Sequence, residues 1–314
     1  MRCERAPCHE KEYVSGHPLQ TRRGIPSRLR EFPERVSPQL HRDPACDNVW
    51  TLGKSLAEKD DLRTKLMIKS LHDWIETDVR PYQEKSVAWL SQYHFFRDPI
   101  RPTYSDPSCF FSPADGVILY QRQVRPEEAI VDIKGKAYSL RDALRDPEFK
   151  AESLIIGIFM TFFDVHVNRI PYPGLLSFKE LDPIDTYNHP MLDVEKRLLQ
   201  DLRISPDSLE YLHHNQRMVN RIFSSQLGQS YYVLQVADYD ADCITPFDLK
   251  QNRPAAQGER FSMIRYGSQV DLIVPLSSRF DFETLQNPGD HVEAGIDPLL
   301  KLTPKTNPQP KHCL

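Results

Sequence analysis

The richest apolar run of the chain, SLIIGIFMTFF at residues 153–163, is followed at once by the ionisable sequence DVHVNR. A helix that crosses a membrane needs about 20 apolar residues, so this run is too short for one. Its β-branched and aromatic residues favour a buried strand instead. The run therefore predicts a sheet in which one strand ends in a cluster of ionisable side chains.

Shorter apolar runs recur after residue 97 and are separated by proline, glycine and aspartate, which indicates a sheet-rich body. Before it, apolar residues three to five positions apart predict a helix over 60–77, and a second helix is expected over 83–93. A polar segment over 191–218 is also expected to be helical. The predicted fold class is α+β, a sheet-rich catalytic body with N-terminal helices. The expected strands lie within 116–120, 129–133, 153–163, 231–237 and 271–275.

The composition divides the chain into four expected segments. Residues 1–46 carry many arginine, proline and histidine residues and are expected to form a flexible extension. Residues 47–96 form the helical N-terminal region, and 97–302 form the catalytic domain. Residues 303–314 are polar and rich in proline, so a disordered tail is expected there.

The charge balance of 40 basic and 44 acidic residues gives no field that would select nucleic acid as a partner. No signal peptide and no membrane-spanning segment is recognised, so the expected location is the cytoplasm or the periphery of a membrane. Six cysteines stand at scattered positions without a C-x-x-C pair, which favours free thiols and predicts no metal site.

The pair Gly267-Ser268 stands directly before an apolar strand, within GERFSMIRYGSQVDLIVP. Such a pair is compatible with a plain turn, in which the hydroxyl caps a backbone group. It is also compatible with self-cleavage, where glycine permits a strained peptide and the Ser268 hydroxyl attacks the Gly267 carbonyl carbon. The resulting ester would eliminate to dehydroalanine, and hydrolysis would release ammonia and leave a pyruvoyl group.

Two further segments carry ionisable residues. If the strand that begins at Ser153 stays extended, Asp164, His166 and Asn168 project from one face and Arg169 from the other. His166 is then the natural general base, although a hydrogen-bonded histidine that closes a strand has the same pattern. In a similar way, the turn FSPADG could place the Asp115 carboxylate beside a histidine or merely bond its own backbone.

These segments, taken together, resemble the shorter bacterial-type phosphatidylserine decarboxylases. The resemblance covers roughly residues 80–300 and includes a weaker match at PGDHVEAGIDPL, which looks like the closing β-hairpin of that family. The two longest motifs make coincidence a poor explanation. The stronger matches are FFRDPIRP, SPADG, IIGIFMTFFDVHVNRIPYPG and GERFSMIRYGSQVDLIVP.

The resemblance implies a role for each matching residue. Ser268 corresponds to the serine that becomes the pyruvoyl cofactor, and Gly267 to the end of the larger chain. Asp115 corresponds to the acid of the processing relay and His166 to the histidine of the decarboxylation step. Many relatives have a second histidine where this chain has Arg169.

Arg169 and Asn168 are therefore candidates for orienting the substrate. The acidic stretch VADYDADC at residues 236–243 also departs from the arginine-bearing stretch of relatives.

The expected function is a self-processing pyruvoyl-dependent decarboxylase that converts phosphatidylserine to phosphatidylethanolamine and carbon dioxide through a Schiff base. Its cleaved chains are expected to remain associated, with peripheral membrane contact. A soluble amino acid is an alternative substrate, because the N-terminal extension is polar where many relatives have an apolar anchor. The residues are also compatible with an unprocessed relative that acts as a binding protein, and with a hydrolase built on Ser268, His166 and Asp115.

Overall fold

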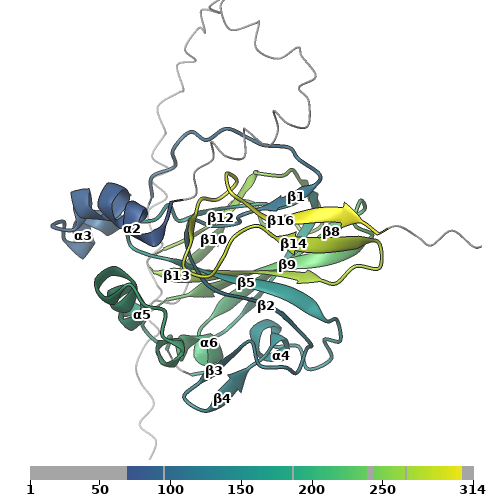
Figure 1. Ribbon diagram of the computed structural model, residues 1–314, viewed down its shortest axis with the longest axis horizontal. Coiled ribbons are helices and arrows are strands. Elements are labelled where there is room, and N and C mark those ends of the chain that lie inside the picture. The colour runs from purple at the N-terminus through teal and green to yellow at the C-terminus, as the bar shows by residue number, and fades with distance from the viewer. Residues whose placement is uncertain (1–68, 95, 186, 239–242, 266, 306–314) are drawn as a thin grey trace, which may run out of the picture. The chain divides into compact units, whose positions relative to one another are not determined.

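An eight-stranded antiparallel sheet forms the centre of the protein in the computed structural model (Figure 1). Its strand order is β11-β7-β8-β9-β13-β5-β2-β15. The structure describes residues 69–94, 96–185, 187–238, 243–265 and 267–305. The strands are β2 (Gly116–Val124), β5 (Ser153–Met160), β7 (Gly174–Leu181), β8 (Arg217–Ser224), β9 (Gln229–Ala237), β11 (Arg253–Ala255), β13 (Ser268–Pro275) and β15 (His291–Val292).

Several predicted segments lie outside the described residues. They include the extension 1–46, part of the acidic stretch at 239–242, and the tail from residue 306 onward. The predicted helix over 60–77 is described only from residue 69.

Strands β13 and β5 are buried along their whole length, because each has a paired strand on both edges and side chains packed on both faces. Alternate residues of β5 serve different cores: Ile156 and Ile158 face one cluster, whereas Ile155 and Phe159 face the other. Strand β5 therefore has no polar face, which explains why its sequence is a continuous apolar run. Strand β13 differs, because its buried side chains Gln269 and Asp271 bond each other.

Three smaller sheets flank the large one. Strands β10 (Ile244–Pro246), β12 (Arg260–Ile264) and β6 (Val167–Arg169) form one, β1 (Cys109–Phe111), β16 (Pro298–Pro304) and β14 (Phe280–Thr284) form another, and β3 (Val131–Ile133) pairs with β4 (Lys136–Tyr138). The predicted closing hairpin over 288–299 is not seen as one, because β15 pairs with β2 whereas β16 pairs with β1 and β14.

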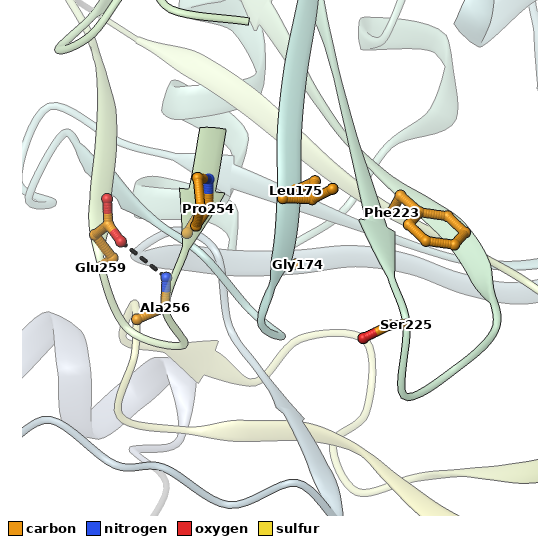
Figure 2. A pocket seen from close by; sticks show the side chains of 8 residues that line it. Gly174, Leu175, Phe223, Ser225, Pro254, Ala256 and Glu259 are labelled. Atoms are coloured by element: carbon orange, nitrogen blue, oxygen red, sulfur yellow. Dashed lines mark hydrogen bonds between the residues drawn. The ribbon is translucent and has the colours of Figure 1, made fainter. Parts of the chain in front are cut away.

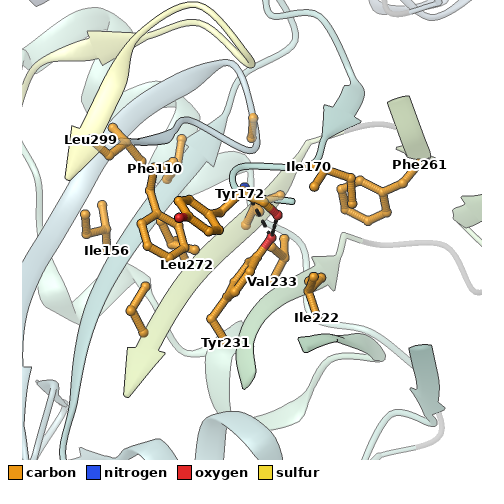
Figure 3. Close-up of a cluster of buried hydrophobic side chains, with 14 of the residues drawn as sticks. Phe110, Ile156, Ile170, Tyr172, Ile222, Tyr231, Val233, Phe261, Leu272 and Leu299 are labelled. Carbon is orange, nitrogen blue, oxygen red and sulfur yellow. Dashed lines mark hydrogen bonds between the residues drawn. The ribbon is translucent and has the colours of Figure 1, made fainter. Parts of the chain in front are cut away.

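The first core cluster lies between the large sheet and the strands β1, β12 and β16 (Figure 3). Phe110 stacks on Tyr172 with ring centroids 4.7 Å apart and meets the edge of Tyr231 at 5.1 Å. The hydroxyl of Tyr231 donates to the backbone carbonyl of Tyr172, so this buried polar group has a partner. The cluster fixes β1 to the large sheet.

The second core cluster is covered by the helices and by the β3-β4 hairpin. The helical segments are α2 (Leu71–Trp74) with its continuations Ile75–Val79 and Arg80–Tyr82, α3 (Val87–Trp89) with Leu90–His94, α4 (Leu140–Leu144), α5 (Leu192–Lys196) with Arg197–Asp201, the turn Pro206–Ser208, and α6 (Tyr211–His214). The α+β prediction is confirmed.

The predicted continuous helix over 191–218 is wrong. The helix that begins at Leu192 ends at Asp201, where Leu202 adopts the left-handed conformation with φ 51°. Pro206 then opens a separate turn, and β8 already begins at Arg217. The polar pattern of residues 191–218 continues past Leu202, where the backbone conformation ends the helix.

Candidate active site

The pair Gly267-Ser268 lies at the start of β13, in the interior of the protein. Ser268 is fully buried and is paired with Met160 of β5 on one edge and with Ala237 of β9 on the other. Gly267 therefore enters the sheet between the ends of two neighbouring strands. We call the turn of residues 161–166 the β5 side of the pair, and Asp238 with the segment 188–195 the β9 side.

The Ser268 hydroxyl has one hydrogen bond among the described residues, to the thioether sulfur of Met160 at 3.4 Å. A thioether is a weak acceptor, so the hydroxyl is not held by a strong partner. The same sulfur accepts from Asn168 Nδ2 at 3.6 Å, and Gln235 Nε2 donates to Asn168 Oδ1 at 2.6 Å. Asn168 is thus brought next to Ser268 through the sulfur of Met160.

The strand that begins at Ser153 does not stay extended as far as His166. It ends at Met160, because Asp164 Oδ2 accepts both the Thr161 amide and the Thr161 hydroxyl at 2.7 Å and so closes a turn. The expectation that Asp164, His166 and Asn168 share one strand face does not apply for this reason. Asp164 and His166 lie in the turn, and Asn168 lies in β6.

The imidazole of His166 is fully buried between two backbone carbonyl oxygens. Nε2 lies 2.9 Å from the oxygen of Thr161 and Nδ1 lies 3.0 Å from the oxygen of Ile264. Burial lowers the pKa of His166, and the nearby carbonyls and Asp164 only partly oppose this. A neutral ring has one N–H, so it satisfies only one carbonyl, and the described structure contains no hydrogen bond from it to Ser268.

Asp164 also binds a second histidine, which the sequence motifs did not single out. His291 Nε2 donates to Asp164 Oδ1 at 2.7 Å, and the imidazole stacks on Trp74 with ring centroids 4.6 Å apart. Burial would raise the pKa of Asp164, but His291 and the two Thr161 donors lower it by more. The carboxylate of the β5 side is therefore ionised at neutral pH.

On the β9 side, Asp238 reaches the glycine of the pair. A Cβ added at Gly267 would stand 3.0 Å from Asp238 Oδ2, which is tighter than ordinary van der Waals contact. Any residue larger than glycine at position 267 would therefore need the Asp238 carboxylate to shift by a few tenths of an ångström. Asp238 Oδ1 accepts the amide of Met191 at 2.8 Å, and the Asp238 carbonyl accepts Asn188 Nδ2 at 2.7 Å.

Glu195 of α5 joins the two sides. Its carboxyl oxygens lie 3.0 and 3.2 Å from the amide nitrogen of Phe162, which belongs to the turn of the β5 side. Burial raises the pKa of Glu195 well above its usual range, and Asp164 and Asp238 add to this effect, whereas the Phe162 amide opposes it. Glu195 thus places a buried carboxyl group between the β5 side and the β9 side.

Comparison with known proteins identifies the family. A family model described as phosphatidylserine decarboxylase matches residues 91–298. The chain belongs to the phosphatidylserine decarboxylase family. Two relatives called phosphatidylserine decarboxylase proenzyme, from Erythrobacter litoralis and Novosphingobium aromaticivorans, are each 32% identical over 198 residues, which is 61% of this chain and 69% and 68% of theirs. A third, from Desulfotalea psychrophila, is 29% identical over 202 residues, 64% of this chain and 75% of its own.

Within this family member, Asp115 does not have a histidine among its hydrogen-bond partners in the described structure. Arg101 binds it through two parallel bonds of 2.6 and 2.5 Å, and the amide of Ala294 adds a third at 2.7 Å. The side chains of Arg101 and Asp115 are only 8% and 5% exposed. Burial alone would lower the pKa of Arg101, but the Asp115 carboxylate raises it by more. Arg101 thus occupies the place where we expected a histidine.

Arg169 lies on the opposite side of β6 from the Ser268 hydroxyl contacts. Its guanidinium donates to the carbonyl of Gly258 at 3.0 Å and to Asp98 Oδ1 at 3.4 Å, at the edge of a hollow that Arg101 and Arg260 also line. Burial lowers the pKa of Arg169, and the charge of Arg101 adds to this effect. The described structure therefore brings together Ser268, Gly267 and Asn168 with His166 nearby, and places Asp115 and Arg169 in a separate cluster of charges.

Sequence reasoning missed Asp238, Glu195 and His291. Asp238 stood in the acidic stretch that departs from relatives, so a signal for it existed. Glu195 carried no signal, because charged residues on helices usually face solvent. The match at PGDHVEAGIDPL contained His291 without indicating its partner.

Another hollow lies elsewhere in the protein (Figure 2). Leu175, Phe223 and Pro254 line it, at the end of the sheet where β7 begins and β8 ends. Arg217, at the other end of β8, pairs with Val236 next to the start of β13, so this hollow is roughly 20 Å from Ser268. It is not part of the site.

Proposed function

We propose that the chain is a proenzyme that cuts itself between Gly267 and Ser268 and then decarboxylates phosphatidylserine to phosphatidylethanolamine. The observation that carries this proposal is the Ser268 hydroxyl, buried next to the Gly267 carbonyl and bound only to a thioether among the described residues. Membership of the phosphatidylserine decarboxylase family supplies the reaction class.

Self-cleavage needs a group that takes the Ser268 proton. The oxygen of Ser268 attacks the Gly267 carbonyl carbon, the amide bond breaks, and an ester forms while the serine nitrogen gains a proton. A base then removes the α-proton of residue 268 as the Cβ–O bond breaks, which releases the Gly267 carboxylate and leaves dehydroalanine; its imine tautomer adds water, loses ammonia and becomes the pyruvoyl group. Both sides of the pair offer carboxyl groups, Asp164 on one and Asp238 on the other.

Decarboxylation uses the same place. The pyruvoyl carbonyl, once formed from Ser268, accepts the substrate amine and withdraws the electrons that the departing carbon dioxide leaves behind. We assign His166 to proton delivery because it bonds the Thr161 carbonyl directly after the end of β5, and Asn168 to orientation of the substrate because it shares the Met160 sulfur with Ser268. His166 must first lose one of its two carbonyl contacts.

Arg169 lies in the cluster with Asp98 and Arg101 and has no assigned part in the proton transfers. Asp115 is retained as a group that acts on processing, held in place by its two bonds to Arg101.

The substrate reaches the protein from a membrane surface in this proposal. No helix among the described residues is long and apolar enough to span a bilayer. We assign contact with the bilayer to the protein surface.

Intact mass under denaturing conditions tests the first step. The parent should separate into residues 1–267 and a chain of 268–314 with a pyruvoyl N-terminus, which Edman degradation cannot sequence. Ser268→Ala should remain one chain, and Ser268→Cys should cleave slowly because it keeps a nucleophile. A parent that remains one chain with a free serine after long incubation overturns the proposal in favour of an unprocessed binding protein.

Release of carbon dioxide from carboxyl-labelled phosphatidylserine in vesicles tests the second step. Borohydride added with substrate should inactivate the cleaved protein by trapping the imine. Turnover of free amino acids without turnover of phosphatidylserine would show that the substrate is a soluble amino acid.

A further inference from the structure

We propose that Asp185, His189 and His214 form a binding site for a divalent transition metal such as Zn²⁺, separate from the Gly267-Ser268 pair. Their ligand atoms, Asp185 Oδ2, His189 Nε2 and His214 Nδ1, all lie within 4.8 Å of one another. Two imidazoles and a carboxylate are a ligand set that Zn²⁺ and its neighbours prefer. No metal motif is visible in the sequence, because the third ligand lies 25 positions after the second.

The distances suit a small cation. Asp185 Oδ2 lies 3.0 Å from His189 Nε2 and 2.7 Å from His214 Nδ1. In a tetrahedral zinc site with bonds near 2.05 Å, neighbouring ligand atoms are about 3.3 Å apart. The two carboxylate distances are therefore within a few tenths of an ångström of that value, and the two imidazole nitrogens, which lie within 4.8 Å of each other, would approach each other when a metal ion binds.

One of these atoms lacks a directed partner. His214 Nδ1 is buried and makes no hydrogen bond of acceptable geometry within the described part of the chain, although the carboxylate is only 2.7 Å away. The short contact is thus off the direction in which the ring nitrogen bonds. A buried polar atom without a partner costs free energy, and a metal ion that shares the Asp185 oxygen would remove that cost.

The ligands are held in place by their backbones. Ile184 donates its amide to the carbonyl of His214 at 2.8 Å, which fixes the loop that carries Asp185 to the end of α6. Asn215 accepts the amide of His189 at 2.6 Å and donates to its carbonyl at 2.8 Å. The imidazoles of His189 and His214 stack with centroids 4.5 Å apart. Ligands so fixed lose little conformational entropy when a metal binds.

The site is open to solvent on the carboxylate side. The Asp185 side chain is 42% exposed, and the two histidines are 27% and 25% exposed. With three protein ligands, a fourth position remains for water, as is usual when a zinc ion is reached from solvent.

The same loop leads to the β9 side of the candidate active site. Asn188 is adjacent to His189 and donates to the carbonyl of Asp238, and Met191 donates to the Asp238 carboxylate. A bound metal would therefore hold the segment that positions Asp238. This consequence depends on the proposed function, whereas metal binding itself does not.

Isothermal titration of the tag-free full chain with Zn²⁺, repeated with Co²⁺ and read by absorption, tests the site. The parent should bind one equivalent, and the Co²⁺ spectrum should lack thiolate charge-transfer bands, which excludes the cysteines as ligands. Asp185→Asn, His189→Gln and His214→Gln should each weaken binding at least tenfold.

Asp182→Asn is the matched control, because Asp182 lies in the same loop and bonds Arg145 through its backbone carbonyl, which the substitution leaves in place. It should bind like the parent, as should His72→Gln, an exposed histidine on α2. Circular dichroism verifies that each variant folds, and the exposed Asp185 is the substitution least able to disturb folding. No saturable binding by the parent, or undiminished binding by Asp185→Asn and His189→Gln, overturns the proposal.

Discussion

The two sides of the Gly267-Ser268 pair are built differently. The β5 side is one contiguous turn in which Asp164 caps Thr161 and His166 bonds the Thr161 carbonyl. The β9 side consists of Asp238 held by Asn188 and Met191, which lie almost fifty residues earlier in the chain. The first is formed by local sequence, and the second exists only after the chain has folded. Chemistry that depends on the first can be recognised in a motif, whereas chemistry that depends on the second cannot.

The largest expected effect tests the β5 side. His166→Ala should reduce carbon dioxide release per cleaved molecule by about 10²–10⁴, the usual contribution of a positioned acid or base. The measurement is turnover normalised to the cleaved fraction found by mass. His72→Ala serves as a control because His72 is exposed. Parental turnover by His166→Ala would remove that residue from the mechanism.

The next largest effect concerns Asp115, whose carboxylate belongs to neither the β5 side nor the β9 side. Arg101→Met leaves the buried Asp115 without its cation, so urea unfolding should show a loss of about 3–5 kcal/mol. Asp115→Asn should chiefly slow self-cleavage, measured as the appearance of the two chains over time.

The two variants separate two roles of Asp115. If the carboxylate takes part in processing, Asp115→Asn slows cleavage more than Arg101→Met does. Equal slowing by both would mean that the ion pair acts only on structure.

A smaller effect tests the β9 side. Gly267→Ala places a Cβ 3.0 Å from Asp238 Oδ2. Overpacking of this kind typically costs about 1–3 kcal/mol. If that cost falls on the cleavage barrier, the rate should drop by roughly 5- to 100-fold. The double variant Gly267→Ala with Asp238→Ala removes the contact. The double variant should then cleave at nearly the same rate as Asp238→Ala alone. If Gly267→Ala slows cleavage as much in the Asp238→Ala background as in the parent, the contact is not the cause.

The smallest effect tests the group that joins the sides. The folded-state pKa of Glu195 is raised, so the unfolded chain loses this proton at lower pH than the folded protein does. The stabilising effect of the protonated group is complete below the unfolded pKa and is lost as pH rises through the folded pKa.

Glu195→Gln mimics the protonated form. The urea concentration at the midpoint of unfolding should be higher for Glu195→Gln than for the parent, and this difference should grow from pH 4 to pH 8. An advantage that is independent of pH would show that Glu195 does not titrate in this way.

The sequence predicted the sheet because β5 is a continuous apolar run of strand length with no polar face. It predicted Ser268, His166 and Asn168 as neighbours in a site through motifs that lie at strand ends. It could not predict where β5 ends, because the capping of Thr161 by Asp164 outweighs the strand preference of the two phenylalanines that follow.

The partners of two buried carboxyl groups were not predicted. Asp115 was expected beside a histidine, and Arg101, which binds it, lies in the matching motif FFRDPIRP without any indication of its partner. Glu195 lies in a helix whose pattern looks polar, and only tertiary packing shows that it points inward to Phe162. Neither contact has a local signal.

Strand β13 is paired on both edges, and the residues after the proposed cut also supply β14, β15 and β16. Cleavage would therefore change the molecularity of unfolding. The uncut chain unfolds and refolds in a first-order reaction, whereas the cut protein would release two chains, and its melting temperature would rise with protein concentration. Dilution after denaturation would separate the two chains, so recovery would follow second-order kinetics. Maturation would convert a single-chain fold into an obligate heterodimer.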